Sequence, residues 1–195
     1  MKAADLARAR KDYDEALALR NGLGEQDTVS STRLAMAELA IEEGHPDAAE
    51  GLATEARDWF QKARKNDDQV NATAVLAAAH LADGKNEEAF KELAKIAPIA
   101  ARTQNLSVQL AYAISQARVK AASHDTGTAR KILNEALAKA TKSGYLAYQF
   151  ESRLAIEELE LKSGKSPASH ARLEKLQKEA KEKGFDLISR KAAAL

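Results

Sequence analysis

A 40-residue step repeats along this chain and limits its possible folds more than any other feature. Small residues mark the step, at Ala9, Ala49, Ala89, Ala129 and Ser169. Four and seven positions after each of them stands another apolar or small side chain, such as Leu93 and Ile96 after Ala89. Offsets of zero, four and seven lie on one face of an α-helix. The spacing therefore predicts one amphipathic helix that recurs five times.

A second set of positions follows the same 40-residue step and predicts the turns. Ahead of the recurring helices stand Gly44, Gly84, His124 and Gly164, and another helical stretch precedes each turn. The repeating unit is therefore helix, turn, helix. Aromatic residues make up only 5% of the chain, with nine Gly and three Pro, a composition typical of helices. We expect an all-α fold in which antiparallel helix pairs stack into a right-handed superhelix, or solenoid.

The same spacing gives the expected boundaries within a single repeat domain, residues 1–195. Residues 1–24 are predicted to be the second helix of a partial repeat, residues 28–66, 67–105, 106–144 and 145–184 the full repeats, and residues 185–195 a capping helix. Pro46 and Pro167 fall in first turns, where proline is tolerated. Pro98 falls inside an expected helix and predicts a kink or an early stop near Ala97. Because the chain begins within a repeat, we expect it to be a fragment of a larger protein.

The charge composition argues against nucleic-acid and membrane partners. With 30 basic and 29 acidic side chains the net charge is +1, so the chain has no general attraction to polyanions. Acidic groups outnumber basic ones in residues 1–68 and the reverse holds in residues 129–195, a polarity that would allow head-to-tail association of copies. The chain has no cysteine and no apolar run long enough to cross a membrane. We expect a cytoplasmic protein.

The repeats resemble the tetratricopeptide repeat family, in which a turn glycine precedes small and large apolar residues at fixed offsets. The likeness is carried by Gly44 with Ala49, Ala53 and Ala56, by Gly84 with Ala89, Leu93 and Ile96, and by Gly164 with Leu173 and Leu176. Ala37, Ala77 and Ala117 occupy the site where the family brings two helices close together, and Glu157 breaks that pattern. The usual step of the family is about 34 residues. The lengthened repeats resemble those of large bacterial regulatory proteins, which implies a scaffold role in signalling.

The resemblance also implies a concave groove, lined by the first helix of each repeat, that binds a peptide or helix of a partner protein. The positions carried over are Leu34, Glu38, Ile41, Asn71, Ala74, Ala78, Leu81, Ile114, Arg118, Leu154 and Glu158, with Glu151 on the same wall. This surface is largely aliphatic, and Arg118 is expected to pair with a carboxylate of the ligand. Alternatively, members such as Leu81 and Leu154 pack against neighbouring repeats. Few Lys or Asn occur at these positions, so the family's clamp for a C-terminal carboxylate is not expected.

No pattern in the sequence indicates catalysis, a metal or a cofactor. The four histidines lack the spacing of a metal site, and Gly22 and Gly24 lack the rest of a phosphate-binding motif. No Ser, His and acid arrangement stands out, and Glu157, Glu158 and Glu160 are interpreted as a solvated helix face. We therefore expect no catalytic residue, no metal and no cofactor, and a protein that is not an enzyme.

Two further patterns bear on the choice of ligand. Gln69, Gln109 and Gln149 recur at the 40-residue step and predict a polar ladder, structural in origin or in contact with a peptide backbone. RNA-reading helical repeats keep a shorter step and a basic groove, so RNA is not the expected ligand. The sequence thus predicts a protein–protein interaction module. The alternative is a structural module for dimerisation or head-to-tail assembly that has no groove ligand.

Overall fold

The structure is a computed structural model that describes residues 3–162, 164 and 166–195, and the described residues are helical without strands. The helices are α1 (Ala3–Leu23), α2 (Gln26–Glu42), α3 (Pro46–Lys62), α4 (Asn66–Ala82), α5 (Asn86–Ala100), α6 (Leu106–Ala122), α7 (Thr126–Lys142), α8 (Leu146–Lys162), α9 (Ser166–Glu182) and α10 (Asp186–Ala194). From α2 onward the helices begin at equal intervals along the chain, and two of them fill one 40-residue step. The predicted all-α fold of helix pairs is confirmed.

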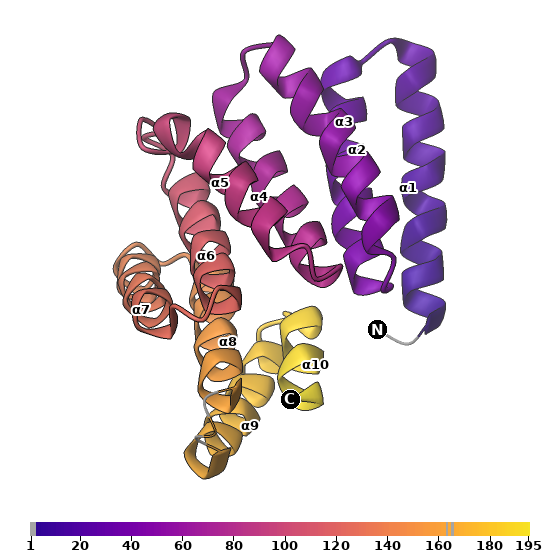
Figure 1. Ribbon diagram of the computed structural model, residues 1–195. Coiled ribbons are helices and arrows are strands. Elements are labelled where there is room, and N and C mark those ends of the chain that lie inside the picture. The colour runs from indigo at the N-terminus through magenta and orange to yellow at the C-terminus, as the bar shows by residue number, and fades with distance from the viewer. Residues whose placement is uncertain (1–2, 163, 165) are drawn as a thin grey trace. The chain divides into compact units, whose positions relative to one another are not determined.

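Backbone contacts divide the chain into two compact units, which we call the N-terminal unit, ending at Tyr112, and the C-terminal unit, beginning at Ala113. In the N-terminal unit, α1, α2, α3 and α4 each pack against the next helix in the chain (Figure 1). The Tyr112 hydroxyl also donates a hydrogen bond to the Leu93 carbonyl oxygen at 3.2 Å. In the C-terminal unit, α7 to α10 pack in the same successive order. Neighbour-to-neighbour packing of this kind is consistent with an α-solenoid.

Within each unit, alternate helices are not equivalent. The first helices α2 and α4 contact each other as well as their chain neighbours, and α8 likewise contacts α10. Among the described residues, α3 does not make such a contact with α5, nor α7 with α9. The first helices of each unit therefore stand closer together than the second helices. We call the layer formed by α2 and α4, and by α8 and α10, the inner layer of its unit.

The apolar ladder predicted from the sequence forms the core. Its members in the second helices are buried, namely Ala49, Ala53, Ala56, Ala89, Leu93, Ile96, Ala129, Leu133, Ala136, Ser169, Leu173 and Leu176. A fourth buried position follows in each helix, at Phe60, Ala100, Ala140 and Ala180. In α1 the matching residues Ala9, Tyr13 and Ala16 are only half-buried, because within the described part of the chain α1 packs against one helix, α2. The many alanines let helix backbones approach closely.

Among the described helices from α1 to α9, all except α5 end in one recurrent turn. A residue with positive φ follows the helix at Gly24, Gly44, Arg64, Gly84, His124, Gly144, Gly164 and Gly184. At Gly44, for example, the Gly44 N–H donates to the Ile41 carbonyl at 3.1 Å and the His45 N–H to the Ala40 carbonyl at 2.9 Å. This pair of bonds satisfies carbonyls that the helix end leaves free. The turn follows first and second helices alike, including at Arg64, Gly144 and Gly184, positions for which the sequence pattern predicted no turn residue.

Arg64 and His124 occupy the left-handed conformation without being glycine, with φ of 56° and 63°. Since this conformation costs a residue with a Cβ about 1–2 kcal/mol, Arg64→Gly is expected to raise the free energy of unfolding by up to about 1 kcal/mol. Gly84→Ala, at the equivalent turn with φ of 74°, should lower it by a similar amount. Urea unfolding followed by circular dichroism measures both. A loss of stability in Arg64→Gly would contradict this view of the turns.

Pro98 shortens its helix. The other helices from α2 to α9 have 17 residues each, whereas α5 has 15 and ends at Ala100. The predicted early stop thus occurs slightly beyond Ala97, with Pro98 inside the last turn. A longer loop follows, in which Thr103 Oγ1 donates to Asp67 Oδ1 at 2.6 Å. Asn105 then caps α6, since its Oδ1 accepts the Ser107 N–H at 3.1 Å.

Candidate functional site

The predicted groove residues all lie on first helices, with different degrees of exposure. Those at least partly exposed are Leu34, Glu38, Ile41, Asn71, Ala78, Leu81, Arg118 and Glu158. Ala74, Ile114 and Leu154 are buried, with 7%, 1% and 0% of their surface exposed. Leu154 belongs to an apolar cluster with Phe150, Leu173 and Leu176. For Leu154 the alternative interpretation, packing between helices, is what the structure shows, whereas Leu81 keeps an exposed part.

Three charged side chains gather on successive first helices of the C-terminal unit. Glu151 of α8 faces the positive charges of Arg118 in α6 and Lys191 in α10. Burial raises the pKa of the Glu151 carboxyl, and the two cations oppose this increase without cancelling it. In the part of the chain that the structure describes, Arg118 makes no hydrogen bond or ion pair with another side chain. Its guanidinium N–H donors are therefore not used by other side chains of the described structure.

The raised pKa of Glu151 predicts the pH dependence of stability. The folded chain holds this proton more tightly than the unfolded chain does, so the stabilisation is complete below the ordinary value of 4.5 and is lost as pH rises through the folded pKa. Glu151→Gln should therefore raise stability at pH 7 and have little effect at pH 4. Urea unfolding at several pH values tests this.

A matched control is Glu87, whose pKa is lowered by a hydrogen bond from Lys91. For this group the stabilisation is present above the ordinary pKa and is lost as pH falls through the lower folded value. Glu87→Gln should then reduce stability at pH 7, the opposite sign to Glu151→Gln. A stability gain in Glu151→Gln that is the same at pH 4 and pH 7 would contradict this assignment.

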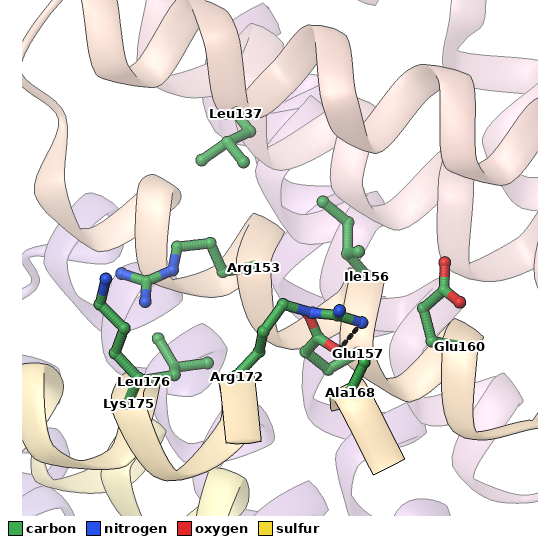
Figure 2. Close-up of a pocket in the computed structure, with 9 residues that line it drawn as sticks. All are labelled: Leu137, Arg153, Ile156, Glu157, Glu160, Ala168, Arg172, Lys175 and Leu176. Carbon is green, nitrogen blue, oxygen red and sulfur yellow. Dashed lines mark hydrogen bonds and ion pairs between the residues drawn. The ribbon is translucent and has the colours of Figure 1, made fainter. Parts of the chain in front are cut away.

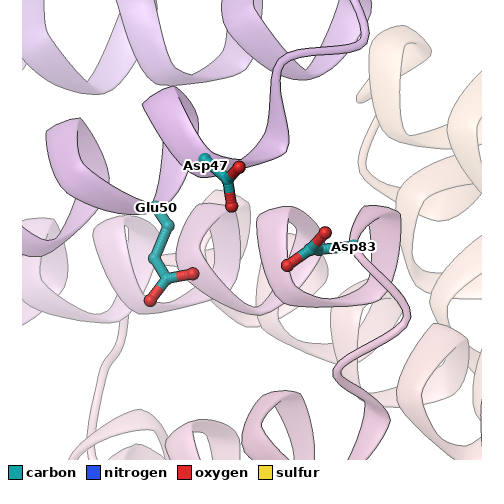
Figure 3. Close-up of side chains that lie close together, drawn as sticks. All are labelled: Asp47, Glu50 and Asp83. Carbon is teal, nitrogen blue, oxygen red and sulfur yellow. The ribbon is translucent and has the colours of Figure 1, made fainter.

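An acidic cluster joins the start of α3 to the turn before α5. Asp47, Glu50 and Asp83 bring one carboxylate oxygen each within 4.8 Å of the others (Figure 3). The Lys85 ammonium lies 2.7 Å from Asp83 Oδ2, 2.9 Å from Glu50 Oε2 and 4.0 Å from Asp47 Oδ1. Hydrogen bonds from this ammonium, first to Asp83 and then to Glu50, raise the Lys85 pKa. The chain thus supplies its own cation to this cluster.

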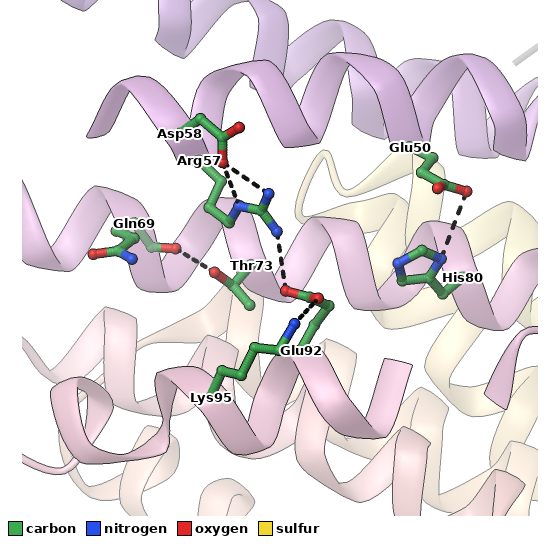
Figure 4. Close-up of polar contacts among 8 residues, drawn as sticks. All are labelled: Glu50, Arg57, Asp58, Gln69, Thr73, His80, Glu92 and Lys95. Carbon is green, nitrogen blue, oxygen red and sulfur yellow. Dashed lines mark hydrogen bonds and ion pairs between the residues drawn. The ribbon is translucent and has the colours of Figure 1, made fainter. Parts of the chain in front are cut away.

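Sequence reasoning did not find this cluster, because its members belong to different helix pairs and share no periodic position. His80 lies beside it, with Nδ1 3.6 Å from Glu50 Oε2 (Figure 4). His80 is only 7% exposed, and its Nδ1 has no hydrogen-bond partner in the described structure. The sequence placed His80 in mid-helix without a ligand cluster, and its neighbours here are a carboxylate and an ammonium that already pair with each other.

A pocket of about 540 Å³ lies in the C-terminal unit between α7, α8 and α9 (Figure 2). It is lined by Leu137, Arg153, Ile156, Glu157, Glu160, Ala168, Arg172, Lys175 and Leu176. Arg172 binds Glu157 with two bonds, Nε to Oε1 at 2.6 Å and Nη2 to Oε2 at 2.9 Å. The other acid, Glu160, forms an ion pair with Arg130 of α7.

The pocket corrects the interpretation of Glu157 and Glu160 as a solvated helix face. Only 5% of Glu157 and 6% of Glu160 is exposed, because α7 and α9 cover α8 from both sides. At the positions of these two acids the first full repeat has Ala37 and Ala40, both fully buried. The acids are tolerated in the interior because each meets an arginine from a neighbouring helix. Those arginines belong to α9 and α7, and no pattern in the sequence marks them as partners of α8.

Two of the recurring glutamines donate hydrogen bonds to the backbone just before their own helix. Gln109 Nε2 donates to the Thr103 carbonyl at 2.8 Å, and Gln149 Nε2 donates to the Ala140 carbonyl at 3.2 Å. Gln69 is buried, with 8% exposed. Both hydrogen bonds run from the start of a first helix to the backbone that precedes it. This supports the structural origin of the pattern, although the bonds go to the backbone and do not link the glutamines to one another.

None of the described helices is both long enough and apolar enough to cross a membrane. The architecture of the described residues is that of helices packed in adjacent pairs, as in helical repeat proteins. The chain matches no protein-family model and no curated protein.

Proposed function

We propose that this chain is a tetratricopeptide-type interaction module, built as a right-handed superhelix, that binds a peptide or an amphipathic helix of a partner protein. The observation that carries the proposal is the closer approach of the first helices within each unit, α2 to α4 and α8 to α10. Side chains on that layer face the inner side of the unit. In such repeat proteins the inner side is an extended binding surface.

The chemistry of the inner layer suggests the kind of ligand. In the N-terminal unit, Leu34, Ile41 and Leu81 are aliphatic and keep part of their surface exposed. They would accept the apolar side of an amphipathic helix or alternate side chains of an extended peptide. In the C-terminal unit, Arg118 of the first helix α6, next to this layer in the chain, offers unused donors, which suit an acidic side chain of the ligand. We further propose that the module is part of a larger bacterial regulatory or signalling protein of the cytoplasm.

A peptide selected from a random library on the immobilised chain provides the test. Leu81→Asp is expected to weaken a peptide bound to the N-terminal unit by about tenfold or more, and Arg118→Glu a peptide bound to the C-terminal unit, as substitutions at central interface positions do. Lys131→Glu, on the exposed side of α7, is the matched control and should leave the affinity unchanged. Unchanged affinity in both of these variants, with helix content intact by circular dichroism, would rule out this face.

A second function, self-association without a groove ligand, is favoured by apolar side chains near both ends. Leu19 and Leu23 of α1 are 66% and 63% exposed, and Leu187 and Leu195 are 40% and 44% exposed. Together with the excess of acidic groups in residues 1–68 and of basic groups in residues 129–195, these suit a head-to-tail contact. Light scattering separates the two functions. Head-to-tail association grows with concentration and weakens above about 0.15 M salt, where charges are screened, whereas a groove module stays monomeric.

A further inference from the structure

Two places among the described helices are equivalent, each with a first helix flanked by two second helices; we call them the first and the second groove, and the first serves as the reference for the second. In the N-terminal unit α3 and α5 flank α4, and in the C-terminal unit, two repeats later, α7 and α9 flank α8. The first groove is bridged, because Arg57 Nη1 of α3 donates to Glu92 Oε2 of α5 at 2.9 Å (Figure 4). The Lys95 ammonium adds a second bond to Glu92 at 2.7 Å.

In the second groove the bridge is impossible. Leu137 stands where Arg57 stands in the first groove, and Arg172 stands in place of Glu92. Neither can pair with the other, so Arg172 instead binds Glu157 on α8 and donates to Ser169 Oγ at 3.1 Å. The outer side of α8 is therefore less covered than that of α4.

The packing of α8 shows the same difference. Leu76 of α4 is 2% exposed, whereas its counterpart Ile156 is half-buried and lines the pocket. Ala77 of α4 is fully buried, and its counterpart Glu157 places a carboxylate at the α8 side of the pocket, which we call the pocket floor. The result is the pocket of about 540 Å³, a size typical of small-ligand sites.

The lining of the pocket is positive at one side and aliphatic at another. Its two acids are already held by arginines, Glu157 by Arg172 and Glu160 by Arg130. Arg153 uses Nη1 for Glu179 at 2.5 Å, and the Lys175 ammonium is 3.9 Å from the same carboxylate. The charged ends of Arg153 and Lys175 lie on the same side of the pocket (Figure 2). One carboxylate thus faces two cations, which leaves positive charge for a second anion.

We propose that this pocket binds an aliphatic carboxylate, with the carboxylate at Arg153 and Lys175 and the alkyl part against Leu137 and Ile156. The charged group gives orientation, and the aliphatic side chains give a surface that excludes water. The ligand is either a free small molecule or an acidic side chain next to an aliphatic one in a peptide. This site lies on the outer side of α8, apart from the inner layer to which we assign the partner protein.

Titration with hexanoate, followed by amide NMR, tests the proposal on the full chain. Saturable shifts are expected in α7, α8 and α9, and hexanol, which has no charge, should bind at least about tenfold more weakly. Lys175→Glu should reduce hexanoate affinity by about the same factor. Since 74% of the Lys175 side chain is exposed, this variant is expected to fold. Absence of saturable binding, or equal affinity in Lys175→Glu, would overturn the site.

A variant that should close the pocket, called the closing variant, copies residues of the first groove into the second. Leu137→Arg, Arg172→Glu and Glu157→Ala together install the bridge and the floor of the first groove, and should abolish hexanoate binding. Lys131→Glu, on the exposed face of α7, and Arg118→Glu, at a predicted groove position on α6, should leave it unchanged, which separates this site from the peptide groove. Hexanoate binding that persists in the closing variant would refute the assignment.

The source of the carboxylate is decided by a blocked peptide with adjacent Leu and Glu. Affinity at least about tenfold above that of hexanoate assigns the pocket to a peptide, and lower affinity assigns it to a small molecule. In both cases the shifts must map to the pocket. Peptide shifts confined to the inner layer, with none for hexanoate in the pocket, would contradict the proposal.

Discussion

Replacing Phe60 by alanine is expected to lower the free energy of unfolding by about 3–5 kcal/mol. Phe60 is 1% exposed and packs against Ala56 and Ala72. Its ring also meets that of Trp59 edge to face, with 5.5 Å between the two ring centroids. Alanine side chains cannot move to fill the space that the ring leaves, so most of the cavity remains. Urea unfolding of the full chain measures the loss.

Phe90 provides the control for this prediction, since 47% of its surface is exposed. Phe90→Ala should lower the free energy of unfolding clearly less than Phe60→Ala, because the Phe90 side chain buries less apolar surface in the folded chain. Hydrogen exchange should show the largest loss of protection in α3 and α4, since a repeat mainly contacts its neighbours. A cost below about 1 kcal/mol for Phe60→Ala would show that this core is not packed as described.

The second large effect concerns the Glu157–Arg172 pair, where the two single substitutions should differ. Arg172→Ala is expected to cost about 1–3 kcal/mol, because it leaves a carboxylate that is only 5% exposed without its partner. We expect the lower end of this range, since half of the Arg172 side chain is exposed to solvent, which screens the interaction.

Glu157→Ala should be nearly neutral or stabilising, because it removes the buried charge and restores the alanine of the other first helices. Ala37, Ala77 and Ala117 are fully buried at this position. In the Glu157→Ala background, Arg172→Ala should then cost little, and a double-mutant cycle by urea unfolding measures the coupling. Equal costs for the two single substitutions, with no coupling, would contradict the role assigned to this pair.

The periodic part of the fold could be predicted from the sequence because packing repeats it. The ladder through Leu93 and Ile96 is buried as predicted, and Pro98 ends its helix early. The turn after α3 was harder to see, because Arg64 holds the left-handed conformation at a position where glycine is the usual signal. The predictions were therefore correct for the positions that one kind of residue marks in every repeat, such as the small or aliphatic residues of the buried ladder.

Single positions that depart from the repeat could not be predicted. Glu157 and Glu160 looked solvated, because the sequence does not show that Arg172 and Arg130 come from other helices to meet them. Likewise Ile114 and Leu154 occupy the predicted inner face but are covered by neighbouring helices. Burial and ion pairing depend on which helices meet in space, and the period of the sequence specifies only that repeats stack.

Site-specific photo-cross-linking in cells tests most directly whether the inner layer binds a partner. A photoreactive amino acid is placed at Asn71, Ala78 or Glu158 on first helices, and at Lys131 or Glu174 on the exposed faces of second helices. We predict covalent adducts with the same partner protein from the inner positions and none from the outer ones. Adducts of equal yield from both sets, or adducts only between copies of this chain, would contradict the assignment of the binding surface to the inner layer.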